Sequence, residues 1–80
     1  MIPKEQIRGL ALAAADAYDL AASGRYLHGY LRLIAGLERA EAARENGEPW
    51  GPELVLLYQE VVERYRKQYV PTDLPQNVEE

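Results

Sequence analysis

Glycine and proline divide this chain into three segments, each of which repeats apolar residues with the period of an α-helix. The breaks lie at residues 23–24 and 46–52. Gly24 stands where a left-handed residue commonly ends a helix, and Pro52 stands where the first turn of a helix tolerates a missing N–H. Alternation of period two, which is typical of strands, never extends beyond a few residues. The pattern predicts an all-α fold, a small antiparallel three-helix bundle with helices at about 4–22, 25–46 and 52–69.

The C-terminal residues differ in character from the rest. They read PTDLPQNVEE, with two prolines and no helical period. We therefore expect a single helical domain over residues 1–70, followed by a disordered or extended tail at 71–80.

The apolar residues of the chain favour a thin core. They make up 48% of the sequence, but most of them are alanine or leucine, and there is no phenylalanine. Alanine buries little area, and a domain of 80 residues is close to the size at which one core supplies only a few kcal/mol. Oligomerisation is a natural way for such a chain to become stable.

Composition also excludes several classes of protein. The chain has no cysteine, so disulfide scaffolds, thiolate metal sites and thiol catalysis are ruled out. The net charge of −4 argues against non-specific binding to nucleic acid, which needs an excess of Lys and Arg. We see no secretory signal and no run of the ~18 apolar residues that spans a bilayer. We expect a cytoplasmic protein without a cofactor.

The segment 25–46 carries more apolar surface than one neighbouring helix can cover. One row contains Tyr26, Tyr30, Leu33 and Leu37, and an adjacent row contains Leu27, Leu31 and Ile34. Tyrosine suits the margin of a core or an interface, because its ring is apolar and its hydroxyl favours water. We therefore predict an interface for seven residues: Tyr26, Tyr30, Leu33, Leu37, Trp50, Tyr58 and Tyr65. The alternative is that the tyrosines edge a small core.

The stretch 24–29, GRYLHG, resembles the middle of a tetratricopeptide hairpin. That family places Gly-x-Tyr at the turn between two helices and small residues where the helices touch. The resemblance implies that Ala17 meets Gly29 and Gly36 across a helical hairpin. It covers about thirty residues and occurs once, whereas a solenoid needs about three repeats. A generic helical hairpin that converged on the same packing is the better explanation.

Basic residues recur along one side of the segment 25–46. The pattern predicts an anion-binding stripe of Arg25, His28, Arg32 and Arg39, because arginine can bind phosphate with two hydrogen bonds. The alternative is a solvated face whose arginines pair with carboxylates on a neighbouring helix.

His28 is the only histidine, and Asp16 and Asp19 could approach it across the first helical hairpin. One imidazole and two carboxylates could ligate a divalent metal or polarise a water molecule. The sequence lacks a Glu-x-x-His or His-x-x-x-His pairing, so this small enzyme or metal site ranks third.

The sequence thus favours a non-enzymatic protein–protein interaction module. We expect it to self-associate as a homodimer through the second and third helices and to act as an adaptor or small regulatory or accessory subunit. A nucleic-acid-linked regulator that uses the arginine stripe is the alternative.

Overall fold

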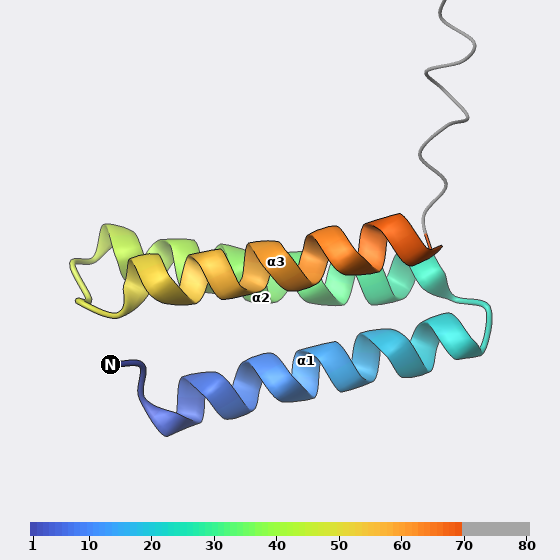
Figure 1. Ribbon diagram of the computed structural model, residues 1–80, viewed down its shortest axis with the longest axis horizontal. Helices are drawn as coiled ribbons and strands as arrows, with labels where there is room; N and C mark the ends of the chain where they lie inside the picture. Colours follow the sequence, from blue (N-terminus) through green and yellow to red (C-terminus); the bar gives the residue numbers. More distant parts are fainter. Residues whose placement is uncertain (70–80) are drawn as a thin grey trace, which may run out of the picture.

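The computed structural model describes residues 1–69, which form three α-helices and no strands (Figure 1). Helix α1 spans Lys4–Ala22, α2 spans Tyr26–Glu45 and α3 spans Gly51–Tyr69. The predicted all-α fold is confirmed, and each helix begins and ends within one residue of its predicted bounds. The tail predicted at 71–80 lies outside the described residues.

The helices end where the sequence predicts, because glycine takes up the left-handed backbone at both turns. Gly24 has φ of 85° and Gly47 has φ of 88°. Arg25 is not yet helical, with φ of −107° and ψ of 56°, so α2 begins one residue later than predicted. Pro3 precedes α1 in an extended conformation, and its carbonyl accepts hydrogen bonds from the amides of Gln6 and Ile7.

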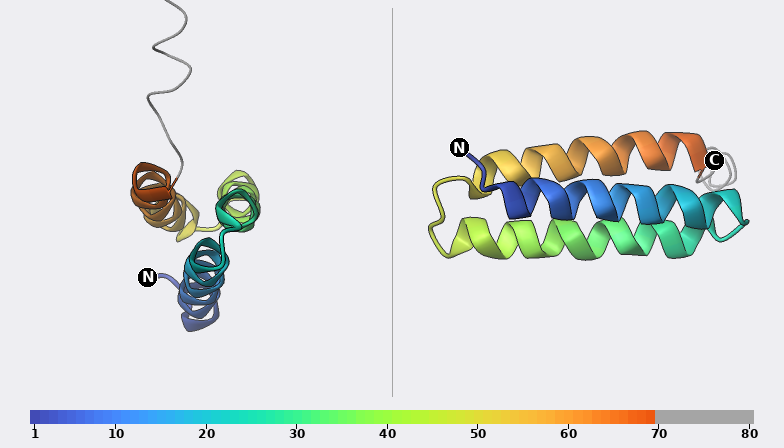
Figure 2. Two further views of the ribbon diagram at one scale, coloured as in Figure 1. Left: turned by 90° about the vertical axis from the view of Figure 1, so that its right-hand side faces the viewer. Right: turned by 90° about the horizontal axis from the view of Figure 1, so that it is seen from below.

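Helix α2 is the central element of the bundle. Helices α1 and α3 pack on two neighbouring flanks of α2 and run antiparallel to it (Figure 2). The contact between α1 and α3 is much smaller than either contact with α2. One side of α2 therefore faces away from both neighbours (Figure 2).

Small residues set the distances between the helices. A Cβ atom added to Gly29 would lie 2.6 Å from the carbonyl oxygen of Ala17, so α1 and α2 approach closely there. A Cβ added to Gly36 would lie 2.8 Å from Cζ of Tyr58, a residue of α3. Ala17 and Gly29 thus meet as the helical-hairpin resemblance implies, whereas Gly36 accommodates a ring from the third helix.

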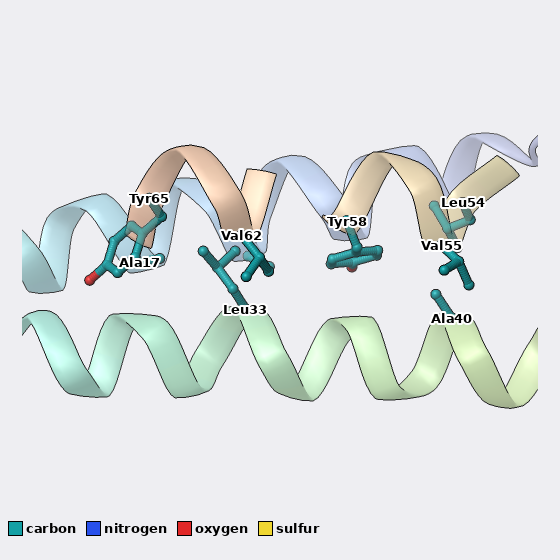
Figure 3. Packing of buried hydrophobic residues seen from close by; sticks show 9 residues of the cluster. Ala17, Leu33, Ala40, Leu54, Val55, Tyr58, Val62 and Tyr65 are labelled. Atoms are coloured by element: carbon teal, nitrogen blue, oxygen red, sulfur yellow. The ribbon is translucent and has the colours of Figure 1, made fainter. Parts of the chain in front are cut away.

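The core is a row of buried side chains between α2 and α3, closed on one side by α1 (Figure 3). Helix α1 contributes only Ala13 and Ala17 to the fully buried set. The others come from the two remaining helices: Leu33, Ala40, Leu54, Val55, Tyr58, Val62 and Tyr65. The larger contacts of the core are therefore those between α2 and α3.

Over residues 1–69, the helices are too short or too polar to cross a lipid bilayer.

Candidate interaction surface

Three of the seven residues predicted for an interface belong to the core. Tyr65 and Leu33 are 0% exposed and Tyr58 is 5% exposed. The side chains that cover them come from the same chain, because Gly29 and Gly36 leave room for the two tyrosine rings. These three residues stabilise the bundle and offer no surface to a partner, which corrects the prediction for them.

The other four residues lie at the margin of the core. Tyr30, Leu37 and Trp50 are half-buried and pack against the buried cluster. Tyr26 is 37% exposed at the start of α2. Part of each side chain remains available to a partner.

A cluster of three tyrosine rings joins the end of α3 to α1. The ring centroids of Tyr18 and Tyr65 are 5.4 Å apart, and those of Tyr18 and Tyr69 are 5.7 Å apart, both in edge-on geometry. The hydroxyl of Tyr65 donates a hydrogen bond of 2.7 Å to the carbonyl oxygen of Tyr26. Burial raises the pKa of Tyr65 above its usual value, and it raises the pKa of Tyr58 likewise. The cluster is thus a structural contact between all three helices.

The large apolar side chains that face solvent are not those predicted for the interface. The leucines that are more than half exposed are Leu12, Leu27, Leu31 and Leu56, with exposed fractions of 56%, 55%, 62% and 64%. Leu27 and Leu31 belong to the second apolar row recognised in the sequence. That row was the available signal, whereas the first row lies nearer the core, with Leu33 fully buried.

We call one line of residues on α2 the outer row: Leu27, Leu31, Ile34, Glu38, Glu41 and Glu45. They recur at alternating intervals of four and three residues, which places them on one side of the helix. The first three are apolar and the last three are acidic. Leu27, Leu31, Glu38 and Glu45 are exposed, and Ile34 and Glu41 are half-buried. The outer row is therefore an accessible surface whose character changes from apolar to acidic along the helix.

Within the predicted anion-binding stripe, the charge of Arg32 is neutralised by an ion pair with α1. Nη2 of Arg32 lies 3.0 Å from Oδ2 of Asp16 on α1, and Nε of Arg32 lies 3.3 Å from the same oxygen. Arg25, His28 and Arg39 are exposed. Of the four stripe residues, one therefore pairs with a neighbouring helix and three face water.

The predicted site around His28 has no metal-binding geometry in the described part of the chain. Asp16, one of its two carboxylates, is held by Arg32. Within residues 1–69, no three His, Asp or Glu side chains lie close enough together to hold a metal ion. His28 instead lines a shallow hollow at the start of α2 with Gly24, Arg25, Tyr26 and Leu27.

This hollow is lined by both apolar and basic residues. Tyr26 and Leu27 supply the apolar part, and Arg25 supplies positive charge. In the last turn of α3, at the same end of the bundle, Arg66 and Lys67 pair with Glu63 of their own helix. The positive charge at the hollow is therefore that of Arg25.

Comparison of the chain with known protein families, curated proteins and solved structures finds no match. The resemblance to a tetratricopeptide hairpin therefore rests on the residues quoted above alone.

Proposed function

We propose that the chain is a non-enzymatic protein–protein interaction module that associates with itself and serves as an adaptor or small accessory subunit. The observation that supports this most directly is the exposure of leucine on all three helices. Leu12, Leu27, Leu31 and Leu56 are each more than half exposed, whereas the buried core contains only two leucines beside three alanines, two valines and two tyrosines.

Exposed leucine costs stability and solubility unless something covers it. Burial of apolar area stabilises by roughly 25 cal/mol per Å², so several leucines left in water forgo a contribution that a small domain needs. Scattered single leucines are ordinary on protein surfaces. Two of these four, however, are one helical turn apart on α2, which is the arrangement that a partner helix recognises.

The solution mass tests self-association. Sedimentation equilibrium of the full chain at micromolar concentrations should give about twice the 9.1 kDa of one chain. A mass of one chain at high micromolar concentration, with helical circular dichroism intact, would contradict self-association. Affinity capture with the immobilised chain would then be the test of a partner of different sequence.

The exposed basic residues support the second candidate, a nucleic-acid-linked regulator. Arg25, His28 and Arg39 lie on one side of α2, and a dimer would double them. Retention on heparin that weakens with salt, and that Arg39→Ala reduces, is the expected result. No retention at low salt would remove this candidate.

A further inference from the structure

We propose that a hollow at the start of α1 binds a small anionic amphiphile, namely a carboxylate that carries a short alkyl chain. This site goes beyond the proposed protein–protein interaction and does not depend on it. Its basis is that two unpaired cations and three apolar side chains line one concave surface, which we call the α1 hollow.

Five residues line the α1 hollow, which has a volume of about 360 Å³: Ile2, Lys4, Ile7, Arg8 and Ala11. The last four are spaced at intervals of three, four and seven residues from Lys4, so they share one face of α1. Ile2 precedes the helix and packs against the buried cluster, which fixes the remaining wall. The volume is near the lower limit for small-molecule sites, ~300–1,000 Å³, so the α1 hollow suits a short ligand.

The apolar part of the lining selects a ligand with an alkyl chain. Ile7 is 42% exposed, although it is a large apolar side chain, and Ile2 is half-buried beside it. Ala11 is exposed and too small to fill the space one turn beyond Ile7. An alkyl chain in the α1 hollow would remove apolar surface of all three residues from water, which is favourable.

The two cations select an anionic head group. Lys4 and Arg8 are exposed, and within residues 1–69 neither has an ion-pair partner within 4.0 Å. Like charges four residues apart repel each other, and positive charge in the first turns of a helix opposes the helix dipole. Glu5, the acidic residue of the first turn, does not line the α1 hollow. A carboxylate bound between the two cations would relieve both penalties, and an arginine can donate two hydrogen bonds to it.

The charge of the chain favours a free ligand over a membrane surface. The net charge is −4, so the molecule as a whole is repelled by anionic lipid. Two cations are also fewer than the clusters of about four to eight Lys and Arg residues that hold proteins on such surfaces. We therefore assign the α1 hollow to a soluble carboxylate.

Calorimetric titration of the full chain with octanoate, below the concentration at which octanoate forms micelles, tests the ligand class. We expect saturable binding of one octanoate per chain with a dissociation constant of about 1 mM. Octan-1-ol has the same alkyl chain without the charge, and acetate has the charge without the chain. Each should bind at least about tenfold more weakly, because each loses one of the two contacts. Octan-1-ol that binds as tightly as octanoate, or no saturable binding of octanoate, would overturn the proposal.

Charge-removing variants test the role of the cations. Lys4→Gln and Arg8→Gln should each raise the dissociation constant for octanoate roughly threefold, since each removes one exposed ion pair with the ligand. Arg25→Gln is the matched control, because Arg25 is an exposed cation at the other end of α1 and lies outside the α1 hollow. It should leave the dissociation constant unchanged. An equal effect of all three variants would show that octanoate responds only to net charge, which contradicts the site.

A second pair of variants tests where the alkyl chain lies. Ile7→Ala should raise the dissociation constant for octanoate several-fold, because it removes apolar contact from the wall of the α1 hollow. Leu12→Ala is the matched control, since Leu12 is 56% exposed on the same helix and does not line the α1 hollow. Both side chains are exposed, so circular dichroism should show unchanged helix content in both variants. Binding that weakens equally in the two variants, or only in Leu12→Ala, would refute the α1 hollow as the binding site.

Discussion

Replacing Gly29 with alanine should destabilise the protein by about 2 kcal/mol, although the same change favours an isolated helix. The new Cβ would meet the hydroxyl of Tyr65 and would lie 2.6 Å from the carbonyl oxygen of Ala17. Carbon and carbonyl oxygen atoms prefer about 3.3 Å or more, so α1 and α2 must move apart by roughly 0.7 Å at their closest approach.

Three contributions give the magnitude. Overpacking of a close contact costs about 1–3 kcal/mol. Displacement of the Tyr65 hydroxyl from the Tyr26 carbonyl costs about 1 kcal/mol more. The higher helix propensity of alanine returns about 1 kcal/mol. For a domain of this size, a net loss of about 2 kcal/mol corresponds to a fall in Tm of about 10 °C.

Gly9→Ala is the matched control for this experiment. Gly9 also lies inside a helix, but a Cβ added there would meet no atom within 4 Å. We expect it to raise the free energy of unfolding by about 0.5–1 kcal/mol. Urea titrations followed by far-ultraviolet circular dichroism, at one fixed chain concentration, compare the two variants. If Gly29→Ala is as stable as the unchanged chain, the close approach of α1 and α2 is refuted.

Three further predictions concern polar groups. Tyr65→Phe removes the hydroxyl that bonds the Tyr26 carbonyl, and urea titration should show a loss of about 1 kcal/mol; an unchanged midpoint would contradict that bond. The raised pKa of Tyr58 and Tyr65 means that the unfolded chain releases their protons first as the pH rises. Their contribution to stability should therefore be complete below pH ~10 and be lost above it, so denaturation midpoints that stay constant from neutral to strongly alkaline pH would refute their burial. Asp16→Asn breaks an ion pair with Arg32 whose two side chains are 53% and 37% exposed. It should cost only about 0.5 kcal/mol, less at high salt, and a loss above 2 kcal/mol would show that the pair is far more buried than the structure places it.

The ends of the helices could be predicted from the sequence because local chemistry determines them. Gly24 and Gly47 adopt the left-handed backbone that other residues avoid, and that conformation stops a helix whatever packs around it. The start of helix α3 could be located in the same way, because Pro52 is a residue that the first turn of a helix tolerates. These signals require no knowledge of neighbouring helices.

The direction in which α2 faces could not be predicted in the same way. Leu33 is fully buried and Leu31 is 62% exposed, although both belong to apolar rows of similar strength. Periodicity gives the width of an apolar face, whereas the neighbours determine which part of it they cover. Here both α1 and α3 lie on one side of α2, so Leu31 is left outside.

The burial of two tyrosines could not be predicted for a similar reason. Tyr58 and Tyr65 are amphipathic, and that property alone favours an edge position. They are buried because Gly36 and Gly29 on the facing helix leave space for their rings. A single sequence does not show which glycine stands opposite which ring, and Gly9, also inside a helix, packs against nothing.

The small contribution of α1 to the core affects how the molecule opens. Only two alanines of α1 are fully buried, whereas α2 and α3 bury leucine, valine and tyrosine against each other. The side chains that α1 itself buries fully are therefore smaller than those that α2 and α3 bury against each other. The molecule should open in two steps, with α1 leaving the α2–α3 hairpin before the hairpin itself unfolds. In native-state hydrogen exchange, the amides of α1 should then exchange through a lower-energy opening than those at the centre of α3, and uniform protection of all three helices would show that the bundle opens as one unit.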